Sequence, residues 1–114
     1  MDNKGFFEVG DVLVGCWGYD ACLYNFYEVV GQTKTMLKLR ELKTRVVGDT
    51  KYPIYYGNLI APITEGADRF EGDTFNRKPS YYQSGNQIHG YVSIKSYMTA
   101  HIWNGKPCDE YNAH

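Results

Sequence analysis

With 114 residues, the chain is short enough to form a single domain, and a domain of this size buries only a modest core. Hydrophobic residues make up 43% of the chain and charged residues 22%, which excludes a disordered protein and indicates a globular one. The formal net charge of −1 excludes a strong overall field that would attract nucleic acid or an anionic membrane.

The first part of the chain predicts three strands and no helix. Short alternating stretches bounded by Gly, Asn and Asp indicate strands at 12–17, 24–30 and 35–42. In the first strand, Leu13 and Trp17 are expected on one face, opposite Val12, Val14 and Cys16. The second strand places Tyr24, Phe26 and Glu28 on one face and Asn25, Tyr27 and Val29 on the other. Only one of these two faces is expected to be fully buried.

The third strand is basic. Residues 34–51 hold six basic residues against two acidic ones, whereas residues 1–31 hold five acidic residues against one Lys. This division predicts either an anion-binding face or the pairing of acidic and basic strands across a sheet. Leu42 departs from the alternation of the third strand, and a bulge or strand end near Glu41 would explain the change of face.

The rest of the chain carries weaker strand signals. Pro62 places residues 58–63 near the edge of a sheet, and residues 64–87 are expected to form one long loop, either functional or mobile. Alternation resumes at 91–94, and residues 96–103 are either a helical turn or a last strand. The predicted fold is all-β: a small, partly open barrel of the SH3-like or OB-like kind, with five or six short strands. The barrel domain spans residues 1–108, and residues 109–114 form a polar tail that is loosely held.

Rings are more numerous than a small interior can hold. The chain has 11 Tyr, 5 Phe and 2 Trp, and a buried Tyr needs a hydrogen-bond partner for its hydroxyl. Several rings are therefore expected at the surface, where aromatic side chains commonly mediate binding. Trp17 lies between two glycines and is expected either in the core or at its rim. The candidate binding residues are Trp17, Tyr19, Asp20, Tyr27, Lys38, Arg40, Lys43, Arg45, Tyr97 and Trp103.

Several stretches resemble a family of small proteins carried by bacteriophages. They are GDVL at 10–13, WGYD at 17–20, NFYEVV at 25–30, VSIKSY at 92–97 and WNGKP at 103–107, together with a Thr-Lys-Thr hairpin and a Leu-Arg-Glu strand. Asn104 and Cys16 stand where the family pattern has Asp and Ser, and the resemblance does not extend over the long loop. The resemblance implies a phage or prophage origin and brings no activity with it.

The sequence gives little support for catalysis, a metal or a cofactor. Cys16, Cys22 and Cys108 are an odd number without a close pair, which fits a reducing cytoplasm and buried structural thiols better than a nucleophile. Zinc ligands would need Cys or His at short spacings, and the chain has no such motif. No phosphate-binding Gly loop precedes a helix, so we expect a protein that is not an enzyme and has no cofactor.

Three functions remain open from the sequence. The first, which we favour over the other two, is an accessory protein that binds a host protein, for instance a component of a defence system, in the cytoplasm of the bacterial host. The second is the binding of a nucleotide or short nucleic acid through stacked rings and the basic third strand. The third is a structural or assembly module of the phage particle. No membrane span is expected. An edge strand near Pro62, together with exposed Tyr, predicts self-association.

Overall fold

Every regular element of the described chain is a β-strand, and every strand pairing is antiparallel. The computed structural model describes residues 6–18, 21–49 and 56–112. Within these ranges the strands are β1 (Val12–Trp17), β2 (Ala21–Gln32), β3 (Leu37–Leu42), β4 (Thr44–Asp49), β5 (Tyr56–Pro62), β6 (Phe70–Arg77), β7 (Ser80–Ser84), β8 (Gln87–Lys95), β9 (Met98–Ile102) and β10 (Cys108–Asn112). The predicted all-β class is confirmed.

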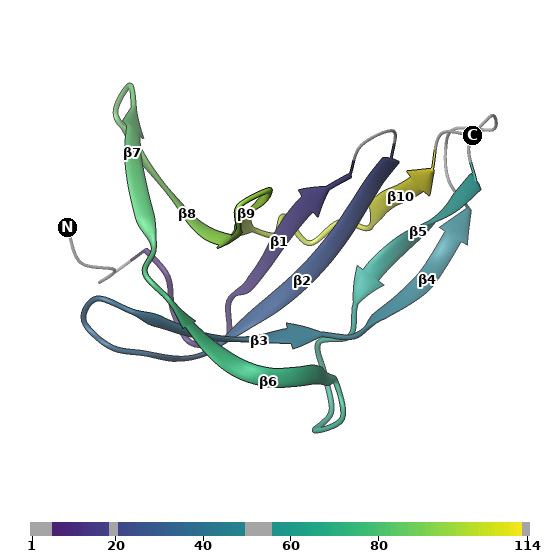
Figure 1. Cartoon of the computed structure of the whole chain (residues 1–114), viewed down its shortest axis with the longest axis horizontal. Coiled ribbons are helices and arrows are strands. Elements are labelled where there is room, and N and C mark those ends of the chain that lie inside the picture. Colours follow the sequence, from purple (N-terminus) through teal and green to yellow (C-terminus); the bar gives the residue numbers. More distant parts are fainter. Residues whose placement is uncertain (1–5, 19–20, 50–55, 113–114) are drawn as a thin grey trace.

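The long strand β2 is the centre of the fold (Figure 1). Along one edge it pairs with β1, from Trp17 opposite Leu23 to Val12 opposite Glu28. Along its other edge, the first residues pair with β10 and the remainder pairs with β3. The sheet therefore divides at β2 into two parts that continue in different directions.

The first part is a partly open barrel. Strands β8 and β9 form a hairpin, and β9 pairs with β1, so that the order of strands around the barrel is β6-β3-β2-β1-β9-β8. These strands enclose the barrel core, formed by Phe7, Leu13, Tyr27, Val29, Leu37, Leu39, Val92, Ile94, Met98 and Ala100. No ladder of backbone hydrogen bonds joins β6 to β8 in the described chain, and we call this open side the seam. One side chain crosses it: Arg77 Nη2 donates to the carbonyl oxygen of Ile94 at 3.2 Å.

The second part is the three-stranded sheet β4-β5-β10. It lies against the outer face of β2 and encloses the second core, formed by Phe26, Leu42 and Ile60. The Trp103 ring packs on Phe26 with its centroid 5.8 Å away, and its Nε1 donates to the carbonyl oxygen of Lys106 at 2.7 Å. Both faces of β2 are therefore covered.

Burial on both faces corrects one expectation and explains another. Phe26 and Tyr27 are adjacent and point to opposite faces, yet they are only 0% and 3% exposed, so the prediction that one face alone is buried was wrong. The two cores also account for Leu42, which keeps the alternation of β3 and enters the second core. The pairing of β3 with β6 is irregular between Leu39 and Glu41, but the extra residues lie in β6. β3 pairs regularly with β2 at these positions, so the change of face expected at Leu42 does not occur.

The described strands outnumber the five or six that were expected. The predicted long loop at 64–87 contains β6 and β7 and the start of β8, because β6 pairs with β3 and β7 pairs with β8. The predicted edge position of residues 58–63 was wrong as well, since β5 lies between β4 and β10. Residues 109–112, expected in a loose tail, belong to β10, which is held by β5 and β2.

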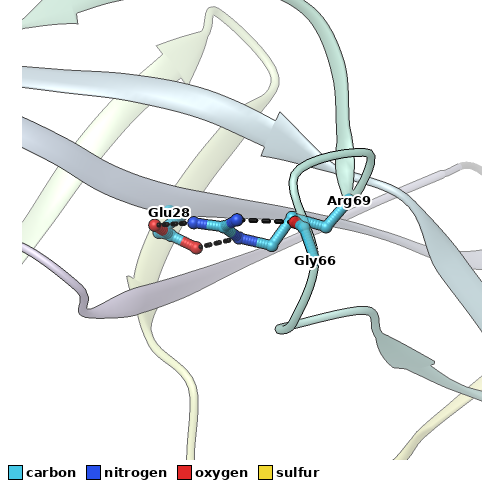
Figure 2. Close-up of polar contacts among 3 residues, drawn as sticks. All are labelled: Glu28, Gly66 and Arg69. Carbon is cyan, nitrogen blue, oxygen red and sulfur yellow. Dashed lines mark hydrogen bonds and ion pairs between the residues drawn. The ribbon is translucent and has the colours of Figure 1, made fainter.

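The segment before β6 is fastened to β2 by Arg69 (Figure 2). Its Nε and Nη2 donate to the two carboxylate oxygens of Glu28, each at 2.9 Å, and its Nη1 donates to the carbonyl oxygen of Gly66 at 2.6 Å. The guanidinium carbon also lies 4.1 Å from the centroid of the Phe70 ring. A bidentate pair of this kind fixes orientation as well as distance, so it sets where β6 begins.

Gly90 allows the N-terminal rings to reach the β7–β8 hairpin, which projects from the barrel in Figure 1. A Cβ at Gly90 would lie 2.5 Å from a Phe6 ring carbon and 2.8 Å from a Phe7 ring carbon. Such distances require the rings to move, and Phe7 is fully buried.

We therefore expect Gly90→Ala to lower the free energy of unfolding by about 1–3 kcal/mol, measured by denaturant titration.

Gly31→Ala is the matched control, because both glycines lie inside strands. A Cβ at Gly31 would meet Lys38 Cβ at 3.5 Å, an ordinary contact, so little change in stability is expected. Equal stability losses in the two variants would contradict the close approach of the Phe rings to Gly90.

Candidate functional site

A pocket of about 270 Å³ opens at the seam of the barrel. β1, β2 and β3 provide one side of it and β6 provides Phe75 and Arg77, while Ile94 and Lys95 of β8 and Met98 of β9 complete the wall across the seam. The missing ladder between β6 and β8 is thus what leaves room for the pocket.

Two pairs of rings line the pocket. Trp17 and Tyr97 lie with their ring centroids 5.6 Å apart, and they are 37% and 58% exposed. Tyr27 and Phe75 meet edge to face at 5.7 Å, and Tyr27 is only 3% exposed. The pocket therefore has an exposed aromatic pair and a second pair that continues into the barrel core.

A chain of hydrogen bonds leads from the exposed pair to a carboxylate. Trp17 Nε1 donates to Asn25 Oδ1 at 2.7 Å, and Asn25 Nδ2 donates to Glu41 Oε2 at 2.8 Å. The register of the strands makes this possible, because Gly15 pairs with Asn25 and Tyr27 pairs with Glu41 on the same face. These two hydrogen bonds fix both the Trp17 ring and the Glu41 carboxylate.

Two cations lie on the other walls. The Arg77 guanidinium carbon is 4.8 Å from the centroid of the Phe75 ring, and Lys95 Nζ is 5.9 Å from that of Tyr97. Within the described residues, neither cation forms an ion pair with Glu41 or with another acidic side chain. The pocket therefore holds charges of both signs that are not paired with each other.

The hydroxyl of Tyr27 is held neutral by its surroundings. Burial raises the pKa of this hydroxyl above its usual value, and the carboxylate of Glu41 and the nearby Tyr97 raise it further, while Arg77 lowers it. All three of these groups line the pocket together with Tyr27. At neutral pH it is available to donate a hydrogen bond.

The structure brings together three of the ten predicted binding residues. Trp17, Tyr27 and Tyr97 all line the pocket, although Tyr27 does so as a buried residue. Tyr19 and Asp20 lie outside the described residues.

The predicted basic residues and Trp103 lie elsewhere. Lys38 and Arg40 alternate with Leu37 and Leu39, which places them on the face of β3 that points away from the barrel core. Arg40 Nε donates to the carbonyl oxygen of Gly72 at 2.8 Å. Lys43 and Arg45 are exposed and do not line the pocket. Trp103 packs against the second core. The expected union of stacked rings with the basic third strand does not occur.

Five polar or aromatic residues of the pocket were missed by the sequence reasoning: Asn25, Glu41, Phe75, Arg77 and Lys95. The predicted pairing of the second and third strands could have located Glu41 beside Tyr27. Phe75 and Arg77 could not be found in this way, because their strand was taken for a loop.

The described chain gives no geometric indication of a metal centre. In it, no group of three or more His, Cys, Asp or Glu side chains is placed to hold an ion. Cys16 is exposed and Cys108 is half-buried, and their side chains lie on strands β1 and β10. No helix in the described residues is long and apolar enough to cross a membrane.

Comparison of the chain with protein families, with curated proteins and with solved structures finds no significant match. The assignment of function therefore depends on the pocket.

The raised pKa of Tyr27 predicts a specific loss of stability in alkali. An unfolded Tyr releases its proton near pH 10, whereas Tyr27 in the folded chain retains it, so ionisation favours the unfolded state as the pH rises above about 10. The free energy of unfolding of the wild type should fall more steeply above this pH than that of Tyr27→Phe. Urea titrations between pH 8 and pH 11 measure the difference, and parallel curves would contradict a buried, neutral hydroxyl.

Proposed function

We propose that this chain is a non-enzymatic binding module whose pocket holds a nucleotide. The observation that carries the proposal is the exposed Trp17–Tyr97 pair, set beside a fixed carboxylate and two cations that have no acidic partner in the described chain. A nucleotide combines a flat ring that stacks, polar edges that hydrogen-bond and a phosphate that attracts cations. Each of these groups has a counterpart in the pocket.

The size of the pocket favours a small ligand over a long nucleic acid. Its volume of about 270 Å³ lies just below the usual range for small-molecule sites. Long single strands are bound along extended basic grooves, whereas this chain has a net charge of −1 and its basic third strand faces away from the rings. We therefore propose a mononucleotide or a similarly small nucleotide as the occupant.

The resemblance to small bacteriophage proteins suggests where such a module acts. We propose that the chain is a phage or prophage product that binds its ligand in the cytoplasm of the bacterial host.

A second candidate function is contact with a host protein. It is favoured by a row of rings on the outer face of β7, β8 and β9: Tyr82 stacks on His89 at 5.0 Å and lies 6.0 Å from Tyr91, which is 6.3 Å from His101. Tyr82 is 49% exposed, and exposed rings of this kind are common in protein interfaces.

Truncating either ring at the mouth of the pocket should weaken nucleotide binding. We expect Trp17→Ala and Tyr97→Ala each to cost about 1–3 kcal/mol, or roughly 5- to 150-fold in Kd, because each removes a stacking surface. Isothermal titration calorimetry with the four nucleoside monophosphates measures the effect. Tyr82→Ala, which removes an exposed ring outside the pocket, is the control and should bind like the wild type. Absence of binding to the wild type, or an equal loss in the control, would overturn the proposal.

A second prediction separates the cations of the pocket from those of β3. Lys95→Glu should weaken nucleotide binding and reduce its dependence on salt, because Lys95 lies at the pocket and is positioned to meet phosphate. Lys38→Glu makes the same charge change on the outer face of β3 and should have little effect. Calorimetric titrations at two salt concentrations provide the measurement. The opposite result would assign the phosphate to the basic third strand.

A further inference from the structure

We propose that Glu41 determines which base the pocket accepts and that it selects guanine. The inference rests on the proposed nucleotide function and adds the identity of the ligand.

The Glu41 carboxylate is held in a fixed position on the pocket wall. The register of β2 and β3 places it beside Tyr27, and Asn25 Nδ2 donates to its Oε2 at 2.8 Å. Asn25 is itself fixed, because its Oδ1 accepts from Trp17 Nε1 at 2.7 Å. Among the residues that the structure describes, the second carboxylate oxygen, Oε1, accepts no hydrogen bond. A carboxylate with one oxygen anchored therefore presents acceptors to the pocket.

An ionised carboxylate only accepts hydrogen bonds, so the edge of the ligand that faces Glu41 must donate. Guanine carries two adjacent donors on one edge, N1–H and the N2 amino group, which match the two oxygens of a carboxylate. Adenine and cytosine place one amino donor beside a ring acceptor, and the N3–H of uracil lies between two carbonyl acceptors. Those acceptors would face the negative charge of Glu41, which favours guanine over the other three bases.

The remaining groups of the pocket are compatible with a guanine nucleotide. The Trp17 indole N–H is engaged by Asn25, so the ring is held for stacking beside Tyr97 rather than for hydrogen bonding to a base. Lys95 belongs to β8, across the seam from β6, and Glu41 belongs to β3. The carboxylate and the ammonium group therefore come from different walls, which lets one ligand present its base to the first and its phosphate to the second.

Calorimetry on the full chain with guanosine, inosine and adenosine monophosphates tests the inference. The wild type should bind guanosine monophosphate roughly 5- to 150-fold more tightly than adenosine monophosphate, the discrimination expected of a bidentate pair with a base. Inosine monophosphate lacks the N2 amino group but keeps N1–H, so its affinity should lie between the other two. Guanosine, without phosphate, should bind more weakly than its monophosphate but keep the preference over adenosine.

Glu41→Gln keeps the shape of the side chain but replaces one acceptor by a donor. It should lose most of the preference for guanine and retain affinity for adenosine monophosphate. The matched control is Glu65→Gln, which makes the same change at an exposed acid outside the pocket and should keep the preference of the wild type.

The outcomes distinguish this inference from the function on which it rests. Equal binding of guanosine and adenosine monophosphates by the wild type, or an unchanged preference in Glu41→Gln, would overturn the role of Glu41 and leave the nucleotide pocket standing. Failure of the wild type to bind any nucleotide would overturn both. The series of three nucleotides on the wild type decides the matter even where Glu41→Gln does not fold.

Discussion

The burial of β2 on both faces is the constraint on which the rest of the structure depends. Phe26 enters the second core and Tyr27 enters the barrel core, although they are neighbours in sequence. A slip of one residue in the register would exchange these faces and drive Asn25 or Glu28 into an apolar interior. The register is therefore fixed from both sides, and with it the positions of the side chains that β2 presents at the pocket.

The pocket forms where the inner face of the barrel changes from apolar to polar. Along β2 this face reads Val29, Tyr27, Asn25, and along β3 it reads Leu37, Leu39, Glu41. Because the two strands are antiparallel and Tyr27 pairs with Glu41, the polar ends of both series meet at one place. The Asn25–Glu41 hydrogen bond is a consequence of this meeting, and it gives the carboxylate a partner without neutralising its charge.

Side-chain alternation predicted the local structure well where strands are apolar on one face. The faces of β1 followed from the sequence, since they depend on the spacing of apolar residues along one strand. β6 was not recognised because five of its eight residues are polar or charged and one is Gly, and its place depends on pairing with β3. The basic third strand was read as a site, but only pairing could show that Arg40 is engaged by the backbone of β6. Three aromatic residues of the pocket were predicted because aromatic residues are recognisable in the sequence. Arg77 and Lys95 were missed because only the fold brings them beside these rings.

The position of the pocket at the seam means that a bound ligand would contact strands on both sides of the opening in the barrel. Across this gap the described residues share no ladder of backbone hydrogen bonds, and the Arg77 guanidinium donates to the carbonyl oxygen of Ile94. A molecule that touches both Phe75 and Ile94 adds cohesion at the point where the backbone supplies least, and it does so only in the folded chain. If the proposed nucleotide binds across the seam, its binding free energy adds to the stability of the folded barrel.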